Sequence, residues 1–214
     1  MATDIDKDCN DRPKALGERL ECQARKARLY EPHITSLTDF VEQVRRKTNK
    51  KKYIPYFDPS DGGIHARCLF LFEAPGSKAV NSGFISRNNP DQTANNFFNL
   101  NRCAGLDRRL TVSWNIVPWY IGSGNKIRPA KNKDIEEGSE YLSQLLDLLT
   151  DIKIIVLVGR KAQRVEKRLR DRSDSIKILK MPHPSPQCVN RAPENRREEI
   201  IGVLRDVKQY INDV

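Results

Sequence analysis

Four short apolar runs, separated by segments with helical periodicity, limit what this chain can fold into. The runs are residues 69–72, 111–117, 154–158 and 176–179, and the helix-like segments are 93–103, 135–149, 160–170 and 194–211. Strands that alternate with helices through short connections favour a parallel sheet with helices on both faces. We therefore predict an α/β fold, a three-layer α/β/α sandwich with a central four-stranded parallel sheet.

The chain divides into two parts at about residue 30. Residues 1–30 are highly charged, and their sparse apolar side chains, including Leu16 and Leu20, predict either an amphipathic helix or a partly disordered segment. Residues 31–214 are long enough to form a single α/β domain. We expect Thr35 or Ser36 to cap a helix in that domain, and residues 53–63 and 76–90 to form loops. The apolar stripe of the capped helix would be Leu37, Phe40, Val41 and Val44.

The chain carries an excess of basic residues, 38 Lys and Arg against 28 Asp and Glu, for a formal net charge of +10. Such an excess favours polyanionic partners, although a solvated, slightly basic surface is the alternative. The densest basic run, residues 45–52, could contact phosphates or serve as a flexible connector. No apolar run is long enough to span a bilayer, and residues 1–10 do not form a secretory signal. We expect a cytoplasmic monomer with no membrane partner.

The cysteine pattern predicts free thiols rather than disulfides or a metal centre. The five cysteines are widely spaced and include no Cys-x-x-Cys pair. Cys68 lies in an apolar run and is expected to be a small core residue. We predict no metal, no iron–sulfur cluster and no other cofactor.

Two of the apolar runs lead into proline-containing loops with titratable side chains. The first run precedes Glu73, Ala74, Pro75 and Gly76, and the last precedes His183, Pro184, Ser185 and Pro186. Loops at the carboxyl ends of parallel strands commonly hold the ligands of open α/β sheets. We therefore predict a site that combines the Glu73 carboxylate with the His183 imidazole. The alternatives are that Glu73 caps a helix or pairs with an arginine, and that His183 is a structural loop residue.

These two motifs resemble the first and second signature motifs of the uracil-DNA glycosylase superfamily. Three segments between them resemble other parts of the superfamily in the same order. They are Asn96-Phe97-Phe98 followed by Ala104-Gly105-Leu106, then Asn115-Ile116-Val117-Pro118, and then Leu157-Val158-Gly159-Arg160-Lys161-Ala162. The resemblance runs from about residue 66 to the C-terminus. Phe72 stands where the superfamily usually has glycine, and the cluster-binding cysteines of the closest Glu-bearing branch are not matched. The resemblance thus implies an atypical, cluster-free member.

The resemblance implies a DNA glycosylase that hydrolyses the N-glycosidic bond of uracil, or of another deaminated base, and so initiates base excision repair. Glu73 would position or deprotonate water and stabilise the cationic sugar, and His183 would donate a hydrogen bond to the departing base. Asn115 would pair with the Watson–Crick edge of uracil. Ala74, Pro75 and Gly76 would line the substrate site. Phe84 would stack on the flipped base, with a core role as its alternative.

The loop after His183 would contact DNA. Ser185 could bind a phosphate, and Val189 or Arg191 could wedge into the duplex, although a simple surface loop is the alternative. Two functions remain: a glycosylase acting on DNA that contains uracil or another deaminated base, and a protein of this fold that binds nucleic acid without cleaving the bond. A serine hydrolase is disfavoured because no Gly-x-Ser-x-Gly elbow is present.

Overall fold

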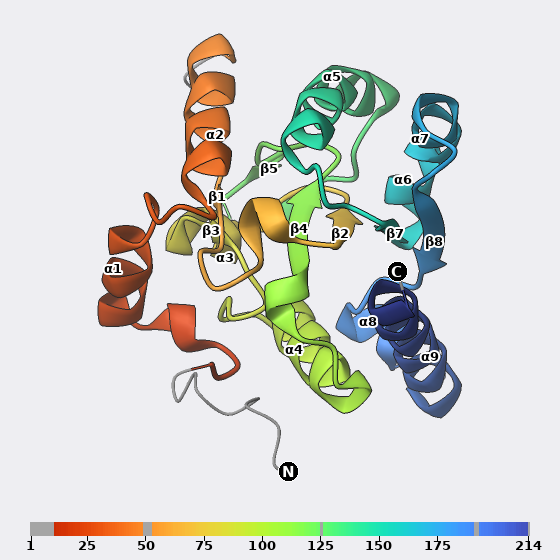
Figure 1. Cartoon of the computed structure of the whole chain (residues 1–214). Helices are drawn as coiled ribbons and strands as arrows, with labels where there is room; N and C mark the ends of the chain where they lie inside the picture. The colour runs from red at the N-terminus through yellow and green to blue at the C-terminus, as the bar shows by residue number, and fades with distance from the viewer. Residues whose placement is uncertain (1–10, 49–52, 125, 191–192, 214) are drawn as a thin grey trace.

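The four apolar runs form one parallel sheet in the computed structural model of this chain (Figure 1). The structure describes residues 11–48, 53–124, 126–190 and 193–213. The strands are β2 (Cys68–Phe72), β4 (Thr111–Asn115), β7 (Ile154–Val158) and β8 (Lys177–Met181), in the spatial order β4-β2-β7-β8. The predicted α/β fold with a four-stranded parallel sheet is confirmed.

The burial of each strand follows from its place in the sheet. The interior strand β7 consists of buried Ile, Val and Leu, as expected for a strand that is covered on both faces. The edge strand β8 instead exposes Lys177 and Lys180, and charged side chains on an edge strand discourage pairing with another chain. In register, Phe72 at the end of β2 lies opposite Asn115 at the end of β4. This pairing brings the chain segments after β2 and β4 to the same edge of the sheet.

Helices cover both faces and give the three predicted layers. In Figure 1, α2 (Thr35–Lys47) and α5 (Asn132–Leu148) lie above the sheet, whereas α4 (Gln92–Ala104) and α9 (Pro193–Asp213) lie below it. Successive strand residues point to opposite faces. Leu71 accordingly belongs to the core under α2 and α5, and Phe70 to the core over α4 and α9. Cys68 is buried on the lower face, as predicted.

Several local predictions need correction. Residues 160–170 form α6 (Gly159–Ala162), a 3-10 turn (Gln163–Val165) and α7 (Glu166–Arg172) rather than one helix. Ile34, and neither Thr35 nor Ser36, is the N-cap residue of α2, and the Thr35 hydroxyl instead donates to the carbonyl of Glu31 (2.9 Å). Of the basic run 45–52, the first three residues end α2, and residues 49–52 lie outside the described residues.

The two predicted loops contain a small parallel strand pair. Residues 53–63 include β1 (Tyr56–Phe57), and residues 76–90 include α3 (Ser77–Ser82) and β3 (Phe84–Ile85), which pairs with β1. Gly83 has φ +86° and ends α3, a left-handed conformation that glycine adopts at little cost. The turn at Gly83 therefore directs the chain from a short helix straight into a strand.

The described part of the N-terminal segment packs on the domain. A 3-10 turn (Ala15–Gly17) precedes α1 (Arg19–Ala27). The predicted helix is present as α1, but Leu16 lies in the 3-10 turn before it and is buried against Leu29 and Phe84, whereas Leu20 in the helix is 77% exposed. Residues 1–10 lie outside the described residues.

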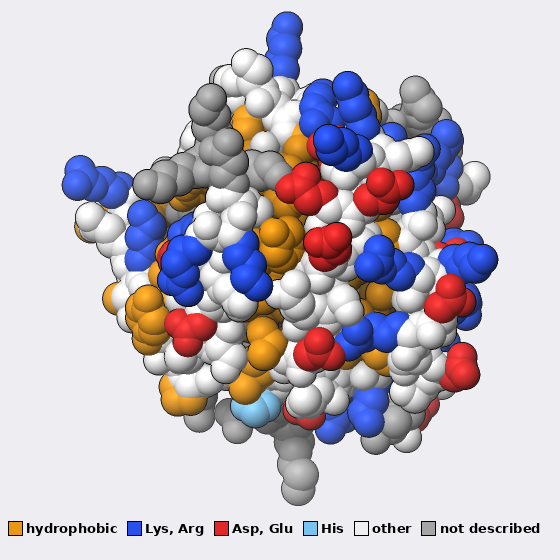
Figure 2. Space-filling view, turned by 90° about the horizontal axis from the view of Figure 1, so that it is seen from above, with side chains coloured by type: hydrophobic (Ala, Val, Ile, Leu, Met, Phe, Trp, Pro, Cys, Tyr) orange, Lys and Arg blue, Asp and Glu red, His pale blue; other side chains and the backbone are white. Residues whose placement is uncertain are grey.

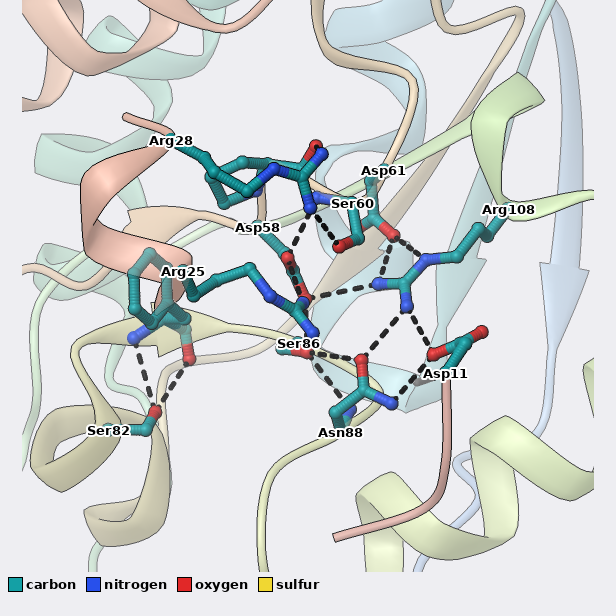
Figure 3. Close-up of polar contacts among 12 residues, drawn as sticks. Asp11, Arg25, Arg28, Asp58, Ser60, Asp61, Ser82, Ser86, Asn88 and Arg108 are labelled. Atoms are coloured by element: carbon teal, nitrogen blue, oxygen red, sulfur yellow. Dashed lines mark hydrogen bonds and ion pairs between the residues drawn. The ribbon is translucent and has the colours of Figure 1, made fainter. Parts of the chain in front are cut away.

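A buried cluster of ions ties this N-terminal segment to the rest of the fold (Figure 3). Arg25 of α1 pairs with Asp58, and Arg108 pairs with both Asp58 (3.0 Å) and Asp61 (2.8 Å). Arg108 and Arg25 hold the pKa of Asp58 well below its usual range, against the opposing effect of burial. Because the opposite charges compensate one another, the protein tolerates ionised groups in its interior.

The same cluster reaches residues 86–88. The Ser86 hydroxyl donates to Asp58, and Asn88 accepts from Arg108 Nη1 (2.9 Å) and donates to Asp11 (2.8 Å). These contacts come from segments far apart in the sequence. They fix the backbone that follows β3.

The surface does not present one uniform charge on the face shown in Figure 2. Lys and Arg side chains there stand beside Asp and Glu side chains, with hydrophobic side chains between them. In the described part of the chain, no helix is both long and apolar enough to cross a membrane.

Candidate active site

A cavity of about 420 Å³ lies where β2, β4 and β8 lead into their following loops. Its lining includes Phe72, Glu73, Ala74, Pro75, Gly76, Lys78, Ser86, Arg87, Asn89, Phe97, Ser113, Asn115, Ile127 and His183. The structure thus brings together both predicted catalytic residues and four of the five predicted substrate-binding residues. The fifth, Phe84, is not part of the lining.

The Glu73 carboxylate is fixed through one of its two oxygens. Oε1 accepts a hydrogen bond from the backbone N–H of Ala130 (2.6 Å), and the Ala130 carbonyl accepts one from Lys161 Nζ (2.8 Å). Within the described residues, Glu73 makes no ion pair, and its Oε2 atom receives no hydrogen bond from the protein. One oxygen therefore holds the side chain in place while the other is available to water or a ligand.

His183 is positioned from three sides. Its ring meets Phe72 edge-on, with centroids 6.0 Å apart, and Asn96 of α4 donates to the carbonyl of Pro184 (2.9 Å). Gly159, with φ +80°, begins α6 beneath the His183 side chain, where a Cβ would come within 3.2 Å of the His183 Cβ. Burial lowers the pKa of His183, so the imidazole is neutral at neutral pH. A neutral ring held this way can donate one N–H to a ligand.

Asn115 gives the clearest indication of what chemical group the cavity would bind. Its side chain is only 3% exposed at the end of β4, and its amide Nδ2 has no hydrogen-bond partner among the described residues. A buried donor without a partner costs about 1–3 kcal/mol. A ligand carbonyl in the cavity would satisfy this amide.

The cavity lining contains a buried arginine that sequence reasoning missed. Arg87 is 8% exposed, and its Nη2 donates to the Thr111 hydroxyl (3.1 Å). Burial and the neighbouring Arg108 lower the pKa of Arg87 to about 10, which leaves it cationic at neutral pH. Arg87 makes no ion pair within the described part of the chain. Its place in a predicted loop gave no sign that it would line the site.

Phe72, and not Phe84, supplies the aromatic wall. Phe84 is 0% exposed because its ring packs with Leu16 and Leu29, so the predicted stacking role of Phe84 is wrong for this structure. Phe72 lines the cavity and packs edge-on against Phe97, with ring centroids 5.4 Å apart. The residue that replaces the expected glycine therefore forms part of the pocket.

The three predicted DNA-contacting residues differ in where the structure places them. Val189 ends the short helix α8 (Pro186–Val189) and is 1% exposed in the core beside α9, so it cannot be the predicted wedge. Ser185 is the N-cap of α8, where its hydroxyl accepts from the N–H of Cys188, and it also lines a second cavity that shares His183. Arg191 lies outside the described residues.

No candidate metal centre or disulfide occurs among the described residues. No group of three or more His, Cys, Asp or Glu side chains there is arranged to hold a metal ion. The four described cysteines, Cys22, Cys68, Cys103 and Cys188, are free thiols. Cys9 lies outside the described residues.

Fold and site together define a parallel α/β protein whose ligand cavity lies at the carboxyl ends of adjacent strands. The family model "Uracil DNA glycosylase superfamily" matches residues 59–208, which include Glu73, Asn115 and His183. The chain belongs to the uracil DNA glycosylase superfamily.

One solved structure that matches part of this chain is described as the "Solution NMR Structure of a putative Uracil DNA glycosylase from Methanosarcina acetivorans". The similarity covers 67% of this chain and 92% of that chain, with 19% sequence identity and a TM-score of 0.48. No curated protein matches this chain.

Proposed function

We propose that this protein hydrolyses the N-glycosidic bond between uracil and deoxyribose in DNA. The observation that carries the proposal is the buried amide nitrogen of Asn115, which has no hydrogen-bond partner among the described residues and lies in the same cavity as Glu73 and His183. A base in a duplex is inaccessible, so the nucleotide must first be flipped out of the stack. The cavity of about 420 Å³ is within the usual size range of small-molecule sites.

Asn115 selects the base in this proposal. Its Nδ2 donates to the O4 carbonyl of uracil, and its Oδ1 accepts from the uracil N3–H. Cytosine presents an amino group and an unprotonated ring nitrogen at the same two positions, so both hydrogen bonds would be mismatched with the amide in the orientation that the structure shows. The buried cation of Arg87 further favours a base that presents carbonyl oxygens.

Glu73 and His183 act on opposite ends of the bond. Water attacks C1′ of the sugar, the C1′–N1 bond breaks, and its electron pair leaves with uracil. The attacking water gives up a proton to the Glu73 carboxylate, and the uracil anion takes up one proton, so the charges balance. The free oxygen of Glu73 orients this water and stabilises the cationic sugar, and neutral His183 donates to the uracil oxygen where negative charge collects. The products are free uracil and an abasic site, the starting point of base excision repair.

The test is incubation of the full chain with labelled single- and double-stranded oligonucleotides that contain one uracil, followed by alkali. We expect strand cleavage at uracil and none at cytosine in the same position. Hypoxanthine in a third set tests other deaminated bases. Absence of cleavage on every substrate, with DNA binding retained, would contradict the proposal and favour a nucleic-acid-binding protein of the same fold.

A further inference from the structure

A lysine outside the cavity lining is joined to the proposed catalytic carboxylate through one residue. Lys161 belongs to α6, the short helix that follows β7, and its Nζ donates to the carbonyl of Ala130 (2.8 Å). The N–H of the same Ala130 donates to Oε1 of Glu73 (2.6 Å). The described residues that line the main cavity, and those that line the second cavity beside His183, do not include Lys161. The hydrogen-bonded path from Lys161 to the site therefore runs through Ala130.

The direction of the Glu73 carboxylate depends on Ala130. The Glu73 carbonyl accepts from the N–H of Val117 (3.0 Å), which continues the pairing of β2 with β4 and fixes the main chain. Among the described residues, the donor to the Glu73 carboxylate is the Ala130 N–H. Ala130 is only 1% exposed, and a buried carbonyl needs a hydrogen-bond donor. Lys161 supplies that donor and so fixes the residue that holds the carboxylate.

The turn after α6 provides a comparison within the same region. Arg164, three residues after Lys161, donates through Nη1 to Oδ1 of Asn132 (2.6 Å), which is two residues after Ala130. Both bonds therefore tie the chain after β7 to the same segment. Within the described residues, Asn132 makes no hydrogen bond with Glu73. A specific effect on the carboxylate is thus expected from Lys161 and not from Arg164.

The placement of the positive charge suits a carboxylate that must bind water. In the part of the chain that the structure describes, neither Lys161 nor Glu73 makes an ion pair. An ammonium group that bound Glu73 directly could occupy the oxygen that is needed for water. Donation to the Ala130 carbonyl is charge-assisted and therefore stronger than a bond between neutral groups. Lys161 can accordingly hold Glu73 in place without blocking its Oε2 atom.

We propose that Lys161 is a positioning residue that fixes the Ala130 N–H and, through it, the orientation of the Glu73 carboxylate toward the attacking water. The inference rests on the proposed function, because that function gives Glu73 a water to orient. A displacement of about 1 Å in a reacting group can lower a rate by about 10²-fold. Because Lys161 does not line the cavity, its loss should slow the chemical step and leave substrate binding unchanged.

Lys161→Met removes the donor and keeps an apolar stem in a half-buried position, so the variant should fold. On an oligonucleotide that contains uracil, we expect kcat to fall about tenfold or more, with KM within about twofold of the wild-type value. Lys161→Arg retains a cationic donor and should restore most of kcat. Arg164→Met removes the neighbouring bond to Asn132 and is the matched control, for which kcat should stay near the wild-type value.

A second readout does not depend on activity. Hydrogen exchange of the Ala130 amide, followed by NMR, reports how firmly its N–H is held against Glu73. The exchange should become about tenfold faster or more in Lys161→Met and should stay near the wild-type rate in Arg164→Met.

The outcomes distinguish the two proposals. An unchanged kcat in Lys161→Met, a change confined to KM, or equal losses in Lys161→Met and Arg164→Met would overturn the positioning role while leaving the glycosylase activity in place. Failure of the wild type to cleave any substrate would overturn the proposed function. In that case the exchange of the Ala130 amide still tests the link, and equal rates for the wild type and Lys161→Met would overturn it.

Discussion

The ring of Phe72 meets the ring of His183 edge to face, with centroids 6.0 Å apart and planes at 86°. Phe72 is the last residue of β2, and His183 follows β8, two strands away in the sheet. The contact therefore joins the two motif loops through side chains that both line the cavity. In this chain the residue before Glu73 supports the imidazole as well as lining the cavity.

Phe72→Ala should impair activity beyond its effect on stability. Truncating the half-buried ring removes its contacts with Phe97 and His183, and we expect a loss of about 2 kcal/mol in the free energy of unfolding. Because His183 loses one of its supports, kcat should fall about tenfold in protein that is still folded. Denaturant unfolding and single-turnover cleavage would measure the two effects separately. A normal kcat would show that Phe72 does not position His183.

Glu73→Gln should abolish most of the chemical step while leaving DNA binding in place. The amide oxygen of Gln can still accept from the Ala130 N–H, but the negative charge near the sugar is lost. We expect kcat to fall about 10²- to 10⁴-fold. Glu136→Gln removes an exposed carboxylate of α5 and is the matched control. Equal rates for both variants would remove Glu73 from the mechanism.

His183 should make the folded state less stable in mild acid. Burial lowers its pKa in the folded protein, so below the ordinary histidine value of about 6.5 the unfolded chain binds a proton more readily than the folded chain. Folding stability attributable to His183 is therefore lost as pH falls through the unfolded pKa. Between pH 7 and pH 5, His183→Gln should lose less Tm than the wild type. Equal losses in the two proteins would contradict the lowered pKa.

Arg108→Met should be strongly destabilising, unlike the same change at its neighbour. Removing Arg108 leaves Asp58 and Asp61 buried with too little positive charge, and we expect a cost of about 3–5 kcal/mol in denaturant unfolding. Arg109, whose ion pair with Asp107 is exposed, should cost at most about 1 kcal/mol on the same substitution. Comparable costs for the two variants would mean that the buried cluster contributes little.

The sheet and the motif loops are predictable from sequence because their information is local. Each strand is a short apolar run, and Glu73, Asn115 and His183 follow or end such runs. Parallel pairing then places them at one edge of the sheet without further knowledge. The helix boundaries shift by a few residues because capping and the 3-10 turn at Gln163–Val165 depend on backbone detail.

The errors concern side chains whose surroundings come from distant segments. Phe84 lies near the first motif, but its burial depends on the N-terminal Leu16 and on Leu29. The sequence suggests that Val189 lies in an exposed loop, but in the structure it ends α8 and packs in the core beside α9. Arg87 lines the site because β3 and the ion cluster hold its backbone there. No periodicity in the sequence encodes these three placements.

The buried cluster around Arg108 determines where the chain of this protein can be shortened. A fragment trimmed to the family match, residues 59–208, would retain Arg108 and Asp61 but discard Asp11, Arg25 and Asp58. In this fragment the buried Arg108 would lose Asp58 and Asp11 as partners. The segment that the fold requires is therefore longer than the segment that matches the family model. A shortened version of the protein should start no later than residue 11.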